Sequence, residues 1–177
     1  DIFAPNLIGE NPTNRIGLWQ KMFSLLYNAN LAGGIGGSAI SAVDSALWDI
    51  TGKATGLSVS ELLGGQIRDK IAVYATGLYY TEGEFPTRLL EEATGYVDAG
   101  FKGMKTKIGG LPMDEDIKRV AALRHAIGPD IKLMVDANQG YNAPSAIRIG
   151  QRLAEHDVLW FEEPVNAKDV EGYLQVK

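Results

Sequence analysis

Residues 103–110 read GMKTKIGG, and the first five of them predict a short buried strand that carries two lysines near its end. Side chains alternate between the faces of a strand, so Lys105 and Lys107 share one face while Met104 and Thr106 share the other. Two like charges are therefore expected close together at one end of this strand. The rest of the chain indicates which groups could lie beside these two positive charges.

The chain after Arg68 alternates short strands with amphipathic helices. The predicted strands are residues 71–75, 103–107, 132–136 and 158–162, and the predicted helices are residues 86–98, 114–127 and 144–155. Gly100 and Gly128 follow two of the helices, where C-terminal caps belong. Repeated strand and helix units form parallel sheets with right-handed crossovers. The candidates are an open doubly wound sheet and a (β/α) barrel, of which four strands would be half.

The first 65 residues predict helices and carry no strand signal. Apolar residues recur at helical spacing in two runs, Ile16, Trp19, Met22, Phe23 and Leu26 and then Ile40, Val43, Leu47 and Ile50. Between them, LAGGIGGSAIS (31–41) has neither the preceding strand nor the Gly-Lys-Ser/Thr ending of a phosphate loop. We interpret it as a connector with Ser38 as the N-cap of the next helix. Gly64 and Gly65 are expected to end the helical region.

The composition argues against several classes of function. The 177-residue chain carries 17 basic and 22 acidic residues, a net charge of -5, which argues against a broad cationic surface for nucleic acid or anionic lipid. It has no apolar run of about 18 residues that could span a membrane and no signal-peptide layout at its start. The absence of cysteine excludes disulfides and thiolate metal sites and favours a cytoplasmic enzyme. Because the first residue is not methionine, we expect the sequence to be incomplete.

Charged residues end three successive predicted strands, at Lys107, Asp136 and Glu162. In both candidate architectures, active sites lie at the carboxyl ends of the strands. A solvated lysine, an Asp-Ala-Asn turn and a Glu-Glu-Pro strand ending would each explain one of these residues, but not their common position at one rim. Two carboxylates without cysteine or a matched histidine are hard oxygen ligands suited to Mg²⁺ or Mn²⁺.

Alternation also predicts the faces of the fourth strand. Val158 and Trp160 should share the face of Glu162, whereas Leu159 and Phe161 should point to the helices.

Two aromatic residues near the predicted rim, Tyr79 and Tyr80, lie in the loop after the first strand, TGLYYTEGEF (76–85). We expect them to contact a polar substrate, or else to belong to an exposed aromatic loop that packs on the helical part. His125 and His156 lie in or at the ends of predicted helices and are expected to be solvated.

Together these motifs resemble the mandelate racemase and muconate lactonising enzyme branch of the enolase superfamily. The resemblance covers essentially the whole chain, in the order and at the spacing of that family, and is carried by ALWDITGKATGLSVSELLGG (46–65), KTK (105–107), VDANQGY (135–141) and FEEPV (161–165). It implies an α/β fold in which residues 68–177 form the first four strands of a (β/α)₇β barrel similar to a TIM barrel. Residues 1–67 would be the C-terminal helices of an α+β capping domain.

The resemblance also implies a set of site residues. Asp136 and Glu162 would be the first two ligands of Mg²⁺, or of Mn²⁺ in its place. Lys107 would be the catalytic base that removes the proton α to a substrate carboxylate, and Lys105 would bind that carboxylate and stabilise the enediolate. Asn138 would lie close to the same substrate. The third metal ligand and the second acid/base group would lie on strands beyond this sequence.

The implied function is Mg²⁺-dependent proton abstraction from a small carboxylate substrate, by an acid-sugar dehydratase or a racemase. A muconate-type cycloisomerase or a dipeptide epimerase of the same superfamily is the alternative, because substrate choice depends on parts beyond this sequence. A Schiff-base barrel aldolase using Lys107 or Lys105, and a degenerate half barrel serving as an oligomerisation module, are further hypotheses. We expect a homo-oligomer. Four strands leave two open sheet edges, so we expect this chain alone to aggregate or to need further residues or a partner.

Overall fold

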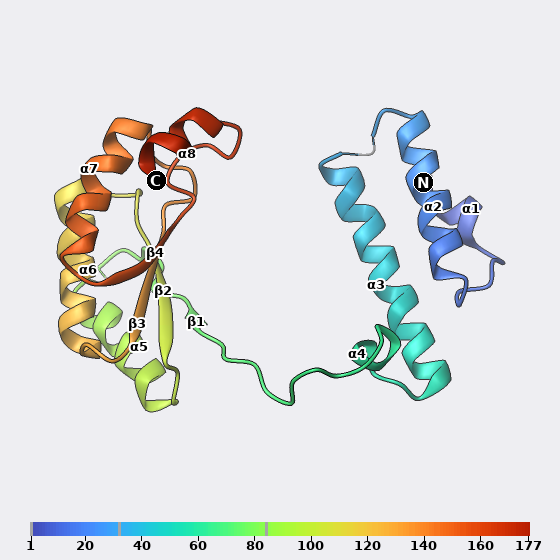
Figure 1. The fold of residues 1–177 in the computed structure, drawn as a ribbon, viewed down its shortest axis with the longest axis horizontal. Coiled ribbons are helices and arrows are strands. Elements are labelled where there is room, and N and C mark those ends of the chain that lie inside the picture. The colour runs from blue at the N-terminus through green and yellow to red at the C-terminus, as the bar shows by residue number, and fades with distance from the viewer. Residues whose placement is uncertain (1, 32, 84) are drawn as a thin grey trace. The chain divides into compact units, whose positions relative to one another are not determined.

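A computed structural model describes residues 2–31, 33–83 and 85–177. Ala32 and Glu84 lie outside the described residues, so the expected connector at 31–41 and the loop at 76–85 are assessed through their other residues. The chain divides into two compact units, a helical unit (Asp1–Lys70) and a sheet unit (Ile71–Lys177), each with its own core (Figure 1).

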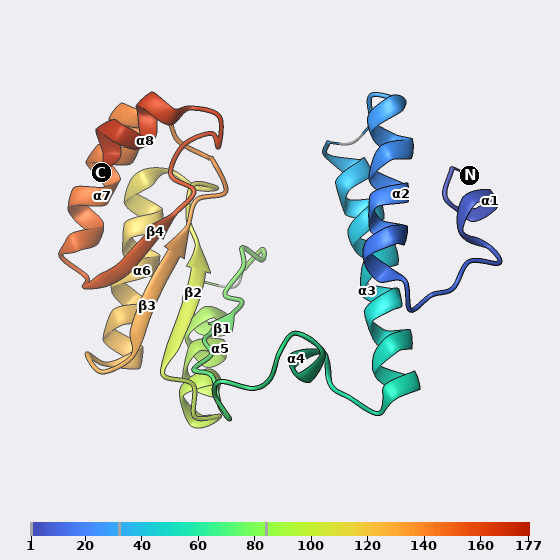
Figure 2. The same ribbon diagram turned by 45° about the vertical axis from the view of Figure 1, so that its right-hand side comes forward.

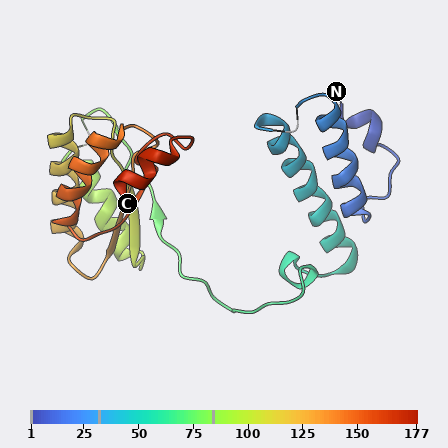
Figure 3. The same cartoon turned by 45° about the horizontal axis from the view of Figure 1, so that its top comes forward.

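The helical unit consists of α1 (Ala4–Leu7), α2 (Arg15–Asn28), α3 (Ile35–Thr55) and α4 (Val59–Leu62). The two long helices, α2 and α3, run antiparallel beside each other (Figure 3). Their apolar residues recur every three or four positions and so form one buried stripe, consisting of Leu18, Met22, Leu26, Ile40 and Leu47. The predicted helical character of this part of the chain is confirmed. No helix of the described residues is long and apolar enough to cross a membrane.

The predicted N-cap at Ser38 is wrong, because α3 begins at Ile35 and its N-cap is Gly34. Gly34 has a φ of 55°, which glycine adopts at little cost. Gly36 allows the early start, since a Cβ at this position would lie 1.7 Å from the carbonyl oxygen of Leu31. Ser38 instead lies inside the helix and donates its hydroxyl to the carbonyl of Gly34 at 3.4 Å.

The helical region ends as expected at Gly64 and Gly65, which both have positive φ, 114° and 116°. The short helix α4 before them is stabilised by a capping box. The Ser58 hydroxyl accepts from the backbone N–H of Glu61, and the Glu61 carboxylate accepts from the backbone N–H of Ser58.

The sheet unit contains four parallel strands in the order β1 (Ala75–Thr76), β2 (Gly103–Lys107), β3 (Lys132–Asp136) and β4 (Val158–Glu162). The connecting helices are α5 (Thr87–Asp98), α6 (Met113–Ile127) and α7 (Ala143–Ala154), and α8 (Val170–Val176) follows β4. Because the strand order follows the sequence and α5, α6 and α7 all cover one face of the sheet (Figure 2), the unit is a segment of a barrel and not a doubly wound sheet.

The core of the sheet unit lies between the strands and these helices. Met104, Leu133 and Val135 project from β2 and β3 into it and pack with apolar residues of the helices such as Val120 and Ile149. The opposite face of β2 and β3 is left to the charged residues that alternate with these apolar ones. Gly100 and Gly128 have positive φ at the ends of α5 and α6, as predicted for C-terminal caps.

The first strand is shorter than the predicted strand at 71–75. Ala75 pairs with Met104, and β2 itself begins one residue earlier, at Gly103. Residues 71–73 therefore extend past the start of β2 and have no strand of the described chain beside them. Ile71 and Val73 are accordingly 73% and 64% exposed.

The faces of β4 depart from simple alternation because the strand contains a β-bulge. Leu133 pairs with Val158 and Val135 pairs with Phe161, so β4 has one residue more than β3 between these pairs. Val158 and Phe161 consequently both pack against the helix-side core, and Leu159 is 53% exposed. The predictions for Val158 and Leu159 are wrong, and the prediction for Phe161 is confirmed.

Replacing Gly36 with alanine should destabilise the helical unit. The new Cβ would lie 1.7 Å from the Leu31 carbonyl oxygen, so the backbone must shift, at a cost of about 1–3 kcal/mol. Gly33→Ala is the matched control, because nothing lies within 4 Å of a Cβ at that position. Urea unfolding followed by circular dichroism measures both variants. A Gly36→Ala protein as stable as Gly33→Ala would contradict the close approach.

Candidate active site at the carboxyl ends of the strands

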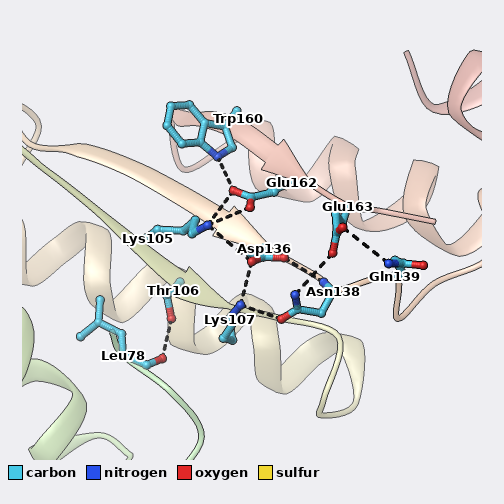
Figure 4. Close-up of polar contacts among 10 residues, drawn as sticks. All are labelled: Leu78, Lys105, Thr106, Lys107, Asp136, Asn138, Gln139, Trp160, Glu162 and Glu163. Carbon is cyan, nitrogen blue, oxygen red and sulfur yellow. Dashed lines mark hydrogen bonds and ion pairs between the residues drawn. The ribbon is translucent and has the colours of Figure 1, made fainter. Parts of the chain in front are cut away.

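The structure brings Lys105, Lys107, Asp136, Asn138 and Glu162 together in one cluster at the carboxyl ends of β2, β3 and β4 (Figure 4). The strand register produces this arrangement. Lys107 lies directly opposite Asp136 on the neighbouring strand, and Asp136 lies directly opposite Glu162. Each of these side chains points to the face of the sheet that the helices leave uncovered.

Lys105 lies between the two carboxylates. Its Nζ donates to both oxygens of Glu162, at 2.8 and 2.7 Å, and lies 3.5 Å from Oδ2 of Asp136. The residue is only 8% exposed. Burial by itself lowers the pKa of Lys105, but the hydrogen bond and the charge of Glu162 outweigh it and raise the pKa above its ordinary value. Lys105 is therefore held as an ammonium group that contacts two anions.

Lys107 binds the other side of Asp136. Its Nζ donates to Oδ2 of Asp136 at 2.7 Å and to Oδ1 of Asn138 at 2.6 Å. Burial tends to raise the pKa of Asp136, which is 3% exposed. The hydrogen bonds from Lys107 and from the Asn138 N–H, with the charges of both lysines, outweigh burial and lower the pKa of Asp136.

The turns after β3 and β4 contain residues with unusual backbone conformations. Asn138, Gln139 and Glu163 have φ values of 44°, 66° and 44°. Each non-glycine residue in this region costs about 1 kcal/mol, and asparagine tolerates it best. Two hydrogen bonds hold the turns, from the Asn138 N–H to Oδ1 of Asp136 and from the Gln139 N–H to the Glu163 carbonyl. The positions of Asn138 and Asp136 are thus tied to each other.

The carboxylates of Asp136 and Glu162 lie on either side of the ammonium of Lys105. The ammonium of Lys105 contacts both, which shows that one cation can be shared between them. Carboxylate oxygens are the ligands that Mg²⁺ and Mn²⁺ prefer. Among the described residues, no group of three or more His, Cys, Asp or Glu side chains is placed to hold a metal. The pair therefore fits part of a magnesium site and would need a further ligand.

The side chains of Tyr79 and Tyr80 point in different directions, although the two residues are adjacent in the loop after β1. The Tyr79 ring lies 5.7 Å from Nζ of Lys107, within reach of the cluster. Tyr80 instead donates its hydroxyl to Oδ1 of Asp116 at 2.5 Å and accepts from the backbone N–H of Gly110. Burial, with the hydrogen bond to Asp116, raises the pKa of Tyr80. The Tyr80 hydroxyl is therefore bonded within the sheet unit, and the contact of the two tyrosines with a polar substrate stays a prediction.

Two further residues shape the site and were not predicted from the sequence. Tyr74 lies with its ring 5.8 Å from Nζ of Lys105 and packs edge-on against Trp160, whose indole N–H donates to Glu162. Asp116 lies on the buried face of α6, one turn before Val120. Its place on the apolar stripe of the helix was the signal that could have identified it.

The histidines contribute nothing to this cluster. His125 is exposed on α6, and His156 lies in the turn before β4, where its carbonyl accepts from Arg124. The expectation that His125 is solvated is in keeping with this exposure.

Both units match sequence profiles of known families. Residues 1–64 match the profile described as mandelate racemase / muconate lactonizing enzyme, N-terminal domain, and residues 88–177 match enolase C-terminal domain-like. The chain belongs to the mandelate racemase and muconate lactonizing enzyme branch of the enolase superfamily. The barrel segment and the strand-end cluster described above are in keeping with this membership.

Several relatives within this family are known enzymes. The chain is 40% identical over 177 residues to the D-galactarolactone cycloisomerase of Agrobacterium fabrum, covering 97% of this chain and 45% of that protein. It is 43% identical over 167 residues to the arabinonate dehydratase of Saccharolobus solfataricus, covering 93% of this chain and 43% of that protein. The chain therefore spans about half the length of the curated relatives it matches.

Solved structures show the same fold. The 3,6-anhydro-D-galactonate cycloisomerase from Zobellia galactanivorans superposes with a TM-score of 0.91 at 42% identity, covering 98% of this chain and 48% of that one. A racemase from Streptomyces coelicolor with bound magnesium superposes with a TM-score of 0.89 at 36% identity, covering 99% and 48%.

Substituting Lys107 with methionine should make the stability of the metal-free protein depend differently on pH. The lowered pKa of Asp136 means that its ionised form contributes stability above the unfolded pKa of about 3.9, and that this stability is lost as pH falls through the folded pKa. Removing its donor Lys107 should therefore cost about 1–3 kcal/mol from pH 7 down to about pH 4, and progressively less as the pH falls further toward about pH 2.

Urea unfolding in the presence of a chelator, repeated between about pH 2 and pH 7, measures this dependence. Lys102→Met is the control, because Lys102 is exposed just before the same strand. A cost for Lys107→Met that is the same at both ends of the range would contradict the proposed coupling to Asp136.

Proposed function

We propose that the whole protein is a Mg²⁺-dependent enzyme that removes the proton α to the carboxylate of an acid sugar or related 2-hydroxy acid, and acts as a dehydratase, a racemase or a cycloisomerase. The observation that supports this most is the order of charges on three adjacent strand ends, with two lysines facing Asp136 and Glu162. Relatives over essentially the whole chain act, by their names, on galactarolactone, arabinonate, and talarate or galactarate.

Lys107 is the proposed base. It lies at the end of β2, where a substrate bound at the carboxyl edge of the sheet can be reached, and Asn138 fixes its amine from one side. Lysine accepts a proton only as a neutral amine, so its ion pair with Asp136 has to be given up before the substrate proton is taken. The Tyr79 ring beside it would exclude water from one side of the amine.

Lys105 is the proposed partner of the substrate carboxylate. Removal of the α-proton places a second negative charge on that carboxylate, and an ammonium already in position stabilises it without reorganisation. A lysine is charged at neutral pH unless its pKa falls by about three units, so Lys105 can supply this positive charge. A divalent cation held by Asp136 and Glu162 would supply further positive charge to the same oxygens. Asn138 and Tyr79 would complete the substrate surface on this side.

The other hypotheses find less support in the geometry. A Schiff-base aldolase, like the proposed base, would need a lysine to give up its ion pair with a carboxylate. It also leaves Asp136 and Glu162 without a role. Borohydride trapping would test for a covalent lysine intermediate, and chelator sensitivity would support the proposed function. A barrel half that served only for oligomerisation would not require buried, paired charges at one sheet edge.

Lys107→Ala should abolish most proton abstraction while leaving the metal site intact. Loss of a general base typically costs about 10²- to 10⁴-fold in turnover. The measurement is solvent deuterium exchange at the α-carbon of candidate acid sugars, because it reports proton removal whatever the product. Lys102→Ala, exposed before the same strand, is the control and should keep the wild-type rate. Wild-type exchange by Lys107→Ala, on the face that Lys107 addresses, would exclude this lysine as the base.

Asp136→Asn and Glu162→Gln should each weaken Mg²⁺ binding by at least about tenfold, since each removes a negatively charged ligand. Glu163→Gln is the matched control. Its carboxylate is directed to the amides of Asn138 and Gln139, so metal affinity should change little. Isothermal titration with MgCl₂ measures the three variants in the whole protein. Equal losses for Glu162→Gln and Glu163→Gln would contradict the assignment of Glu162.

A further inference from the structure

Asp116 is a fully buried carboxylate outside the strand-end cluster. It lies in the first turn of α6 and is 0% exposed. Its Oδ1 accepts from the Tyr80 hydroxyl at 2.5 Å, and its Oδ2 accepts from the backbone N–H of Gly109 at 2.7 Å and from the Tyr141 hydroxyl at 3.3 Å. A buried carboxylate is costly unless such donors surround it, so its place here requires an explanation.

The donors to Asp116 come from three different loops. Tyr80 belongs to the loop after β1, Gly109 to the loop after β2, and Tyr141 to the loop after β3. Tyr80 also joins the first two loops directly, because its hydroxyl accepts from the Gly110 N–H. One side chain on α6 therefore connects three consecutive loops at the carboxyl edge of the sheet.

Each of these loops carries or adjoins a residue of the proposed site. Tyr79 precedes Tyr80, Lys107 lies two residues before Gly109, and Asn138 lies three residues before Tyr141. The second and third loops also touch, since a Cβ at Gly109 would lie 3.2 Å from the Ala137 carbonyl oxygen. A displacement of Asp116 would thus be passed to Tyr79, Lys107 and Asn138 together.

Arg119, one turn further along α6, reinforces the first of these connections. Its guanidinium lies 4.7 Å from the centre of the Tyr80 ring, and it donates to the Leu78 carbonyl at 3.3 Å. The residues on either side of Tyr79 are therefore both held by α6. Burial raises the pKa of Asp116, and its hydrogen-bond donors only partly offset this effect.

We propose that Asp116 is a positioning residue that fixes the three loops relative to one another and thereby sets the spacing of Tyr79, Lys107 and Asn138. The inference rests on the proposed function, since positioning matters only if these residues act on a substrate. A base misplaced by about 1 Å can lose about 10²-fold in rate even though the substrate still binds. The expected signature is a fall in kcat with a much smaller change in KM.

Three substitutions, each made in the whole protein, test the hydrogen bonds between Asp116 and the three loops one by one. Asp116→Asn disturbs all three, Tyr80→Phe removes the connection to the first loop, and Tyr141→Phe removes the connection to the third. The control is Arg124→Met on the same helix, because Arg124 binds the carbonyls of Gly128, Ile131, His156 and Asp157 at the opposite end of the strands. It should lower the melting temperature and leave kcat unchanged.

Hydrogen exchange with mass spectrometry and α-proton exchange kinetics are measured on the same samples. Asp116→Asn should speed amide exchange in segments 77–83, 108–112 and 137–142 and lower kcat by at least about tenfold. Tyr80→Phe should affect the first segment and, through the lost acceptor of the Gly110 N–H, the second, whereas Tyr141→Phe should affect only the third. Adding Tyr80→Phe to Asp116→Asn should lower kcat by less than Tyr80→Phe does alone, because both substitutions act on the same hydrogen bond.

The proposal is overturned if Asp116→Asn behaves like Arg124→Met, with a lower melting temperature, protected loops and an unchanged kcat. If Asp116→Asn does not fold, Tyr80→Phe decides: wild-type kcat and wild-type protection of 77–83 would overturn the proposal. If the wild-type protein exchanges no α-proton, the proposed function fails and, with it, the catalytic part of the inference. The loop connections are still tested by the amide exchange.

Discussion

In-register parallel pairing places Lys107 beside Asp136 and Asp136 beside Glu162, and the rest of the site depends on that register. Adjacent strands lie about 4.8 Å apart, so Asp136 on the middle strand lies between Lys107 on one side and Glu162 on the other. A slip of one residue would turn these side chains into the helix-covered core. Leu133 and Val135 prevent such a slip, because both are fully buried in the core on the helix-covered face of β3.

The charges so placed are a poor source of stability. Taking a lysine and a carboxylate out of water costs several kcal/mol per ion, and well-packed apolar residues of similar size are often at least as stable. Lys105 and Asp136 are nonetheless almost fully buried, and Lys107 adds a second cation to the same carboxylate. These buried charges contribute little to the free energy of folding. The chemistry that they can perform explains them better, in keeping with the family to which the chain belongs.

The strand ends could be predicted because alternation and helical periodicity both depend on local sequence. The second, third and fourth strands occur where those patterns predict them, and with them the convergence of Lys107, Asp136 and Glu162. The bulge in β4 could not be predicted, since it depends on how Val158 and Phe161 pair with another strand. The hydrogen bond between Tyr80 and Asp116 could not be predicted either, because the two residues are distant in sequence and come into contact only in the folded sheet unit.

Backbone strain gathers at the same edge of the sheet as the charges. In the described part of the chain, six non-glycine residues have positive φ, and four of them, Leu78, Asn138, Gln139 and Glu163, follow β1, β3 and β4. Leu78 is fully buried in this conformation, with its N–H bonded to Glu92 and its carbonyl to Thr106. Such residues persist only where surrounding contacts over-determine them. Because the contacts come from α5, α6 and neighbouring strands, the helix layer sets the geometry of loops whose side chains face the opposite, charged side of the sheet.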